Sequence, residues 1–387
     1  MNEGIYKLLK DRYFLSGEDS WEQLAERVGA LYEPITEDIK QMKFIPSSPT
    51  LMNANTGGKR KGTLSSCFPM NIEDSIEGIF ESLKECSLVT KFGGGIGVDW
   101  SSLRGSSEQI ASLDGRESSG PLPFISIFNE MLDGINQNGV RRGAGMSLLS
   151  IYHEDILDFI NAKQNTDKFT RFNFSVKVDG DFYAKLEKTP DAPHIVKEVV
   201  SGKEKELKDK EGNVVTVKQL WDLIMERSWS GAEPGVFHND LAFERCASTN
   251  IDVNVMCNPC SEYINIPYSA CSLGSINLAL LVKKEKFNWK EFEELIAKGT
   301  RYLNATLDKN HFPIDKIKKV NMQIRPVGLG IMGLAHLLYK LKIPYNSKEA
   351  IDFVSELFLY LTLRAMKESI ELAKEEGGAY KAFDCDL

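Results

Sequence analysis

The segment MCNPCSEY places an amide, two thiols and a carboxylate close together in the sequence. Its Cys257-x-x-Cys260 spacing is typical of zinc sites and of dithiols that exchange disulfides. If the segment is extended, side chains two positions apart share a face, so Asn258, Cys260 and Glu262 would project together while Cys257 faces away. Such a face can act on one small substrate. The alternative is a polar loop around a buried cysteine.

Zinc binding would require four ligands from the chain's seven cysteines and five histidines. Cys246 and Cys271 would complete a set with Cys257 and Cys260, but the spacing is irregular and the histidines form no close pair. A thioredoxin-like site should open a helix, whereas Pro259 lies between these cysteines and an extended pattern, SEYINIP, follows. Both interpretations are disfavoured, and the four-cysteine zinc set is kept as an alternative.

Length and composition indicate a folded protein that handles small molecules. The chain has 387 residues, of which 42% are hydrophobic, and a formal net charge of −8. This negative charge disfavours nucleic acid and anionic membranes as general partners. No stretch is long and apolar enough to predict a membrane span, and the N-terminus has no signal-peptide core. We therefore expect a cytoplasmic protein with reduced thiols.

The elements that must position these residues alternate between strands and helices, which predicts an α/β fold. Residues 1–45 look helical, with Ser20 and Gln23 as a capping box. Further along, RFNFSVKV is typical of a strand and VKQLWDLIMERSW of a helix. The charged run from 203 to 211 predicts a solvated hairpin.

Three cysteine segments together resemble one family. Asn258-x-Cys260-x-Glu262, Cys271 in CSLGSINLA and Cys67 in LSSCF are similar to the catalytic constellation of the ribonucleotide reductase large subunit. The similarity runs from FIPSSPTLMNA to GLGIMGLAHLL. Several separated positions match, so the resemblance is more specific than any single motif.

The resemblance implies a role for each of these residues. Cys260 would form a thiyl radical at the tip of a finger loop and abstract the 3′ hydrogen of the substrate ribose. Glu262 would take the proton of the 3′ hydroxyl, and Asn258 would orient the ribose hydroxyls. Cys67 and Cys271 would supply two electrons as the 2′ hydroxyl leaves as water, and would end as a disulfide. Cys257 would be structural.

The same resemblance implies binding positions for the substrate. Thr50 in SPTLMNA and Ser66 would contact substrate phosphate and ribose, and Asn173 in RFNFSV would line the substrate pocket. Arg142 in GVRRGAGM would face the substrate from a flexible loop. The alternative for Asn173 is a strand asparagine that is satisfied by the backbone.

Positions for a deoxynucleotide effector also follow from the resemblance. Asp74, Lys91 and Arg104 match residues that bind a dNTP or ATP effector at the interface of a homodimer. Arg141 belongs to the loop that relays the identity of the effector to the substrate site. Taken without the resemblance, these residues are ordinary surface charges.

The fold implied is the ten-stranded α/β barrel of the ribonucleotide reductase and glycyl radical type, incomplete here, with a small N-terminal helical region. We expect residues 1–45 to form that helical region. Residues 46–387 would hold the first half of the barrel, the finger loop and part of the second half. The chain shows no ATP cone, no tyrosine pair for radical transfer and no cysteine tail. It is therefore expected to be inactive alone and to need a complementary C-terminal reductase chain.

The resemblance leaves two classes of radical source. The absent ATP cone and the NPC and GGGIG segments look most like the adenosylcobalamin-dependent class II enzymes. The alternative is a class I large subunit, with no cofactor of its own and a metal-radical centre in a partner subunit. A thioredoxin or glutaredoxin would re-reduce the cysteines, and no metal is expected in this chain. A third possibility is a non-catalytic, dNTP-binding regulatory fragment.

A glycine pattern near the C-terminus imitates a dinucleotide site. Gly328-x-Gly330-x-x-Gly333 fits the dinucleotide fingerprint, with a strand-like segment before it and a helical one after it. No second mononucleotide-binding half follows. We therefore interpret these glycines as a packed strand-to-helix turn.

Overall fold

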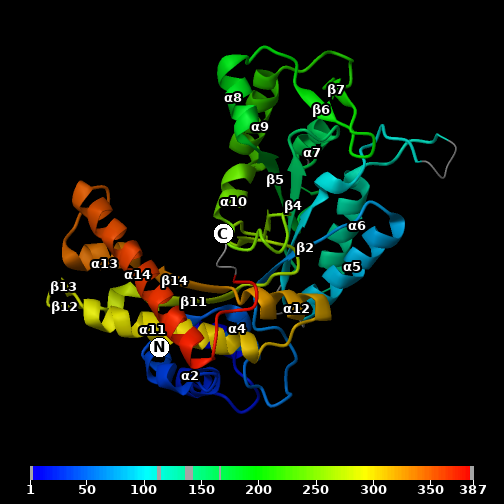
Figure 1. The fold of residues 1–387 in the computed structure, drawn as a ribbon. Coiled ribbons are helices and arrows are strands. Elements are labelled where there is room, and N and C mark those ends of the chain that lie inside the picture. Colours follow the sequence, from blue (N-terminus) through cyan, green and yellow to red (C-terminus); the bar gives the residue numbers. More distant parts are fainter. Residues whose placement is uncertain (1–2, 111–114, 136–142, 165–166, 384–387) are drawn as a thin grey trace. The chain divides into compact units, whose positions relative to one another are not determined.

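The computed structural model describes residues 3–110, 115–135, 143–164 and 167–383. The chain divides into two compact units, which Figure 1 shows coloured along the sequence. The first unit combines Met1–Ser66 with Ala270–Leu387, and the second is Cys67–Ser269. The predicted division into an N-terminal helical region, residues 1–45, and a catalytic barrel, residues 46–387, stays a prediction.

The second unit is built on a five-stranded parallel sheet. Its strands are β2 (Cys67–Met70), β3 (Gly95–Asp99), β4 (Gly145–Ser150), β5 (Phe172–Val178) and β8 (Gly235–His238), in that spatial order. The interior strands read as runs of small and apolar residues because parallel sheets are covered on both faces. Since the strands run in one direction, Cys67, Gly95 and Gly145 all lie at the amino-terminal edge of the sheet.

Helices connect these strands as crossovers. They are α5 (Ile76–Lys91), α6 (Pro121–Gly134), α7 (Ile156–Asn161), α8 (Gly180–Lys188) and α9 (Val217–Gly231), with a short 3₁₀ turn at Trp100–Ser102, and α10 (Asn239–Arg245) follows the last strand, β8. The predicted strand RFNFSVKV is β5, and the predicted helix VKQLWDLIMERSW is α9. Two small hairpins complete the unit: β6 (Ile195–Lys197) with β7 (Glu204–Glu206), and β9 (Met256–Cys257) with β10 (Ile264–Asn265).

The first unit contains a three-stranded sheet with β11 at its centre. The strands are β1 (Phe44–Pro46), β11 (Ser272–Asn277) and β14 (Val327–Met332); β1 is antiparallel to β11 and β14 is parallel to it. The N-terminal part adds α1 (Glu3–Arg12), α2 (Trp21–Gly29), η1 (Glu33–Ile35), α3 (Thr36–Lys40) and α4 (Ser48–Asn53). The C-terminal part adds η4 (Leu278–Leu280), the hairpin of β12 (Val282–Lys283) and β13 (Lys286–Phe287), α11 (Trp289–Asp308), α12 (Asp315–Ile324), α13 (Leu334–Leu341) and α14 (Lys348–Glu375).

One hydrophobic core joins the two sequence segments of the first unit. Phe44 is fully buried, and its ring occupies the space that side chains at Gly274 and Gly299 would need. Tyr302 of α11 packs edge-on against Phe44, with ring centroids 5.5 Å apart. Its hydroxyl donates to the carbonyl of Val28 in α2 at 3.1 Å. The N-terminal helices are therefore part of the core that α11 and the sheet build.

The structure confirms a mixed α/β protein with a parallel sheet. Neither sheet closes on itself in the described part of the chain, so the ten-stranded barrel is not confirmed. Among the described helices, none combines the length and apolar character needed to cross a membrane.

Candidate active site

The segment between β9 and β10 is a closed hairpin loop, and we call residues 256–265 the finger hairpin. The backbone N–H of Asn258 donates to the carbonyl of Tyr263 at 3.1 Å, and the N–H of Tyr263 returns to Asn258 Oδ1 at 3.0 Å. Within this loop the N–H of Ser261 donates to the Asn258 carbonyl at 3.1 Å, and Ser261 has a positive φ of 62°. The tip is therefore a tight turn.

This turn corrects the expectation of an extended segment with alternating faces. Because the chain reverses at Ser261, residues two apart do not share a face. Instead the neighbours Pro259 and Cys260 line the same cavity, while Asn258 is fully buried and Glu262 is exposed. The sequence spacing alone does not reveal the turn, since Cys-x-x-Cys spacing occurs in extended and folded loops alike.

Glycines of β3 allow the finger hairpin to lie directly on the sheet. A side chain at Gly97 would overlap the carbonyl oxygen of Cys257, and one at Gly95 would lie 2.9 Å from Pro259 Cγ. Backbone can approach backbone this closely only where there is no Cβ. Asn173 of β5 adds a tie, because its Nδ2 donates to the Pro259 carbonyl at 2.8 Å. The glycine-dense stretch KFGGGIGVDW thus has a packing reason.

Cys67 and Cys260 line one small cavity in the second unit, which we call the thiol cavity. Its volume is about 60 Å³, and Thr90, Pro259 and the glycines 93–95 also line it. Cys67 begins β2 and is 5% exposed, whereas Cys260 at the tip of the finger hairpin is exposed. The fold therefore brings together two of the predicted thiols from distant parts of the sequence.

Asn258, two residues before Cys260 in the finger hairpin, holds an unsatisfied polar group. Its Oδ1 accepts from Tyr263, but its Nδ2 has no hydrogen-bond partner among the residues that the structure describes. A buried amide donor that is left unpaired is costly, so such groups in native proteins call for a ligand or water. The bond from the Tyr263 N–H fixes the orientation of the Asn258 amide. The sequence analysis did not predict this role for Tyr263.

Cys257 is isolated from the thiol cavity. It is fully buried, and its Sγ lies 3.4 Å from Ser261 Oγ. Burial raises the pKa of the Cys257 thiol to about 11. A neutral, inert thiol of this kind is typical of a structural cysteine.

Cys271 and Ser66 lie in the first unit, next to each other. The N–H of Ser66 donates to the carbonyl of Cys271 at 3.0 Å, and both residues are buried. A side chain at Gly328 would lie 3.1 Å from Cys271 Sγ and would overlap Leu273. The first glycine of the Gly328-x-Gly330-x-x-Gly333 pattern thus has a packing reason, although Gly330 has room for a methyl group.

Thr50 is also buried in the first unit, and its hydroxyl donates to the carbonyl of Leu64 at 3.1 Å. The segment that leads to Ser66 is further held by Asn310. Its Oδ1 accepts from the Leu64 N–H at 2.6 Å, and its Nδ2 donates to Ser65 Oγ at 2.8 Å. A lone asparagine gives no sequence signal for this role, which the sequence reasoning missed.

Two of the predicted effector residues contact each other in the second unit. Arg104 Nε donates to Asp74 Oδ2 at 2.8 Å, and the Arg104 backbone N–H donates to Asp74 Oδ1 at 3.1 Å. Lys91, the last residue of α5, lies over the ring of Phe92 with its Nζ 5.7 Å from the centroid. Arg141 and Arg142 fall outside the described residues.

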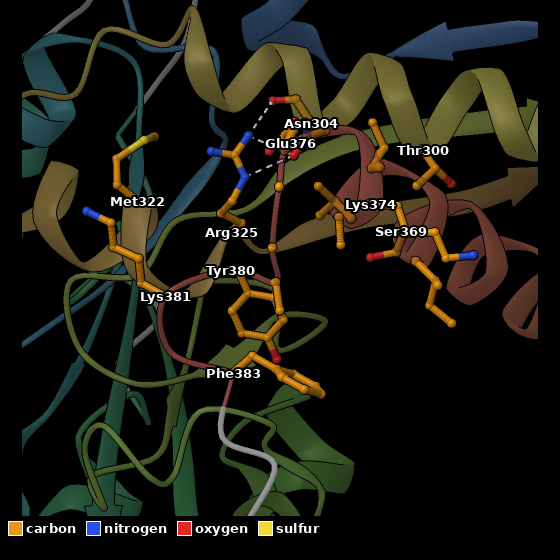
Figure 2. Close-up of a pocket in the computed structure, with 17 residues that line it drawn as sticks. Thr300, Asn304, Met322, Arg325, Ser369, Lys374, Glu376, Tyr380, Lys381 and Phe383 are labelled. Carbon is orange, nitrogen blue, oxygen red and sulfur yellow. Dashed lines mark hydrogen bonds between the residues drawn. The ribbon is translucent and has the colours of Figure 1, made fainter.

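A cavity of about 760 Å³ in the first unit contains none of the predicted residues (Figure 2). Arg325 points at Asn304 there, with Nε and Nη2 donating to Oδ1 at 3.0 and 2.7 Å. Asn304 Nδ2 in turn donates to Glu376 Oε1 at 3.1 Å. These three side chains are hydrogen-bonded to one another and hold the carboxyl end of α14 in place.

The described residues contain no group of three His, Cys, Asp or Glu side chains placed to hold a metal ion.

Comparison with known proteins gives one family. The model described as "Ribonucleotide reductase, barrel domain" matches residues 65–386. A vitamin B12-dependent ribonucleoside-diphosphate reductase from Thermoplasma acidophilum is 38% identical over 343 residues, 88% of this chain and 43% of that protein. One from Mycobacterium tuberculosis is 32% identical over 376 residues, 96% of this chain and 52% of that protein.

A relative without B12 in its name is also similar. The ribonucleoside-diphosphate reductase large chain of Schizosaccharomyces pombe is 29% identical over 369 residues, 89% of this chain and 45% of that protein. The chain spans about half the length of the curated relatives it matches.

The close approach at Gly97 predicts a specific cost for a methyl group. Gly97→Ala should lower the free energy of unfolding by about 3 kcal/mol, because backbone must move to relieve the overlap. Gly330→Ala is the matched control, since a methyl group there makes an ordinary 3.5 Å contact with Ser275 Oγ. Urea unfolding of both variants measures the difference, and equal effects would contradict the packing described for Gly97.

The two cysteines of the finger hairpin should differ in reactivity. With iodoacetamide at pH 8, Cys260 should be modified about a hundredfold faster than Cys257. The reason is that iodoacetamide reacts with the thiolate, and burial suppresses the thiolate form of Cys257. Mass spectrometry of the native and the urea-unfolded protein checks this, and equal rates in the native protein would contradict it.

Because the folded pKa of Cys257 lies above its ordinary value of 9.0, the contribution of this thiol to the stability of the fold is lost as the pH rises from 9 to about 11.

Proposed function

The chain belongs to the ribonucleotide reductase barrel-domain family, and from that premise we propose that it carries the thiols with which the whole protein reduces ribonucleotides to deoxyribonucleotides. The observation that supports this most is the thiol cavity, which Cys67 and Cys260 both line. The unsatisfied amide of Asn258, in the same hairpin as Cys260, adds to it. The names of the relatives support a ribonucleoside diphosphate as the substrate.

In the proposed reaction Cys260, as a thiyl radical, removes the 3′ hydrogen of the ribose and returns a hydrogen at the end. Glu262 accepts the proton of the 3′ hydroxyl, and the Nδ2 of Asn258 donates to a ribose hydroxyl. The 2′ hydroxyl leaves as water, and the two electrons come from two thiols that become a disulfide. The net change is one ribonucleotide and two thiols to one deoxyribonucleotide, one disulfide and water.

We assign the reducing pair to Cys67 and Cys271. Ser66, which directly precedes Cys67 in the sequence, is bonded through its N–H to the carbonyl of Cys271 at 3.0 Å. The pairing itself rests on the resemblance, because Cys67 belongs to the second unit and Cys271 to the first. A thioredoxin or glutaredoxin would reduce the disulfide for the next turnover.

For the substrate contacts, we propose that Asn173 and Thr50 hold neighbouring segments in place, which changes how they contribute to substrate binding. Asn173 uses its Nδ2 to hold Pro259, so it positions the finger hairpin and offers its Oδ1 to the substrate. The Thr50 hydroxyl is bonded to the carbonyl of Leu64 and so holds the segment before Ser66. Ser66, which directly precedes Cys67 in the sequence, is then the proposed hydroxyl contact to the substrate. Arg142 is retained as a substrate contact from the resemblance alone.

The radical source is proposed to be adenosylcobalamin, which would supply the radical that Cys260 carries. Two relatives named for vitamin B12 support this class, while other relatives support a class I large subunit with a partner that holds the radical. The exposed Cys260 is accessible to either source. The thiol cavity, at about 60 Å³, is too small for a corrin ring, so the cofactor would lie outside this cavity.

The effector site is proposed at Asp74, Lys91, Arg104 and Arg141. The ion pair of Asp74 with Arg104 supports a shared site for at least two of them. A homodimer is proposed over α5 and α6, because Ile76, Phe80 and Ile127 on these helices are 60%, 48% and 40% exposed. An apolar surface of this kind favours association with a second copy.

The remainder of the barrel is proposed to add next to β14. This strand pairs only with β11 among the described residues, so its other edge is open to a further strand. Helix α14, which packs on α11 as β14 does, exposes Leu359, Leu363, Met366 and Ile370, each by more than half. An open strand edge and an apolar helix face in the same unit are suited to another strand and helix of a ten-stranded barrel, supplied by a complementary C-terminal segment.

The central test compares two cysteines in the reductase that contains this chain. Cys260→Ser should abolish deoxyribonucleotide formation, because serine cannot carry the radical, while Cys257→Ser should keep at least about half of the activity. Assays with adenosylcobalamin, or with a separate radical-generating subunit, identify the radical source. Equal loss in both folded variants would refute the assignment of Cys260.

The effector assignment has its own test by calorimetric titration with dNTPs. Arg104→Ala should weaken binding by about tenfold, the order expected for loss of a charge-assisted hydrogen bond. Lys84→Ala, an exposed lysine on the same helix as Lys91, should bind normally. Unchanged binding to Arg104→Ala would argue against this site, and dNTP binding by a folded protein that never turns over would favour a regulatory role instead.

A further inference from the structure

Thr90 is a buried hydroxyl residue near the carboxyl end of α5, and it lines the thiol cavity with Cys67 and Cys260. It is 3% exposed, and its Oγ1 has no hydrogen-bond partner in the part of the chain that the structure describes. The two serines of α5 are different: Ser82 Oγ donates to the Asn71 carbonyl at 2.6 Å and Ser87 Oγ to the Leu83 carbonyl at 2.7 Å.

The unpaired hydroxyl of Thr90 is unexpected on physical grounds. A helical threonine commonly bonds the carbonyl four residues earlier, as Ser87 does on this helix. The backbone carbonyl of Thr90 is satisfied, because it accepts from the Gly93 N–H at 2.9 Å. Burying a hydroxyl without a partner is unfavourable, and valine has the same shape without that cost. A ligand outside the protein chain would satisfy the group.

The orientation of the Thr90 side chain is restricted. A side chain at Gly143 would lie 3.2 Å from Thr90 Cγ2, so the methyl group packs close to that glycine. Threonine is stiff at χ1, and fixing the methyl group also fixes the hydroxyl. Oγ1 is therefore a preset hydrogen-bonding group rather than a rotor that adapts to its surroundings.

The size of the thiol cavity decides which ligand fits. Ligand pockets for drug-sized molecules occupy roughly 300–1,000 Å³, whereas this cavity measures about 60 Å³. It has room for a small number of water molecules, each of which needs a volume on the order of 10–15 Å³. Water also needs polar partners, and the Thr90 hydroxyl and the cysteine thiols are such partners.

We propose that the Thr90 hydroxyl binds an ordered water molecule in the thiol cavity, and that this water holds the Cys67 thiol in one orientation. Thr90 is then a positioning residue that acts on a reducing thiol through water. The inference rests on the proposed function for the role of Cys67, but the water site itself does not depend on it. Cys67 suits this arrangement because it is buried at the start of β2, where bulk solvent does not order its thiol.

The kinetic test uses three variants of the reductase that contains this chain. Thr90→Val removes only the hydroxyl, and kcat should fall about five- to tenfold with an unchanged KM for the ribonucleotide, as for one lost hydrogen bond. Thr90→Ser keeps the hydroxyl and should remain near wild type. Ser87→Ala removes a hydroxyl of the same helix and should have no effect on kcat.

A crystal structure provides the readout that is independent of activity. The wild-type protein should show a water within hydrogen-bond distance of Thr90 Oγ1, and Thr90→Val should lack it while melting at the same or a higher temperature. A dry cavity, a fully active Thr90→Val, or a raised KM without a change in kcat would each overturn the proposal. A wild-type protein that reduces no ribonucleotide would instead contradict the proposed function, and the positioning role would fail with it.

Discussion

The carbonyl oxygen of Cys257 occupies space against Gly97 that any side chain would need. This contact between two backbones sets the depth at which the finger hairpin lies on the parallel sheet. The position of Pro259 over Gly95 and its bond to Asn173 follow from it. A site that must hold its side chains to within about 0.5 Å benefits from such support, because backbone contacts on a sheet vary less than contacts between flexible side chains.

Burial then separates the cysteines by chemistry. Cys257, in strand β9 of the finger hairpin, is fully buried and its thiol pKa is raised, so it is kept protonated. Cys260, three residues further, is exposed. Cys67 is buried in the same cavity that Cys260 lines. Three thiols of identical composition thus gain distinct properties from their surroundings alone.

The first unit prepares the segments that carry Ser66 and Cys271. Its core is closed by Phe44, whose ring fills the space left by two glycines, and by Tyr302, which ties α11 to α2. On this base Asn310 clamps residues 64 and 65, and Ser66 is bonded to the carbonyl of Cys271. These contacts order the segments that carry Ser66 and Cys271.

The sequence by itself determined the α/β class, the helical start of the chain and, through the resemblance of separated motifs, the family and the thiols of interest. Periodicity and motif spacing carry that information because they are local. Only the tertiary structure decided that the loop at Asn258 is a turn, that Asn173 holds Pro259, and that Thr90 lines the thiol cavity. The last two are contacts between residues far apart in the chain, whereas the turn depends on bonds from Ser261 and Tyr263 to Asn258 that motif spacing does not reveal. The absence of a side chain at Gly97 likewise matters only because Cys257 lies against it.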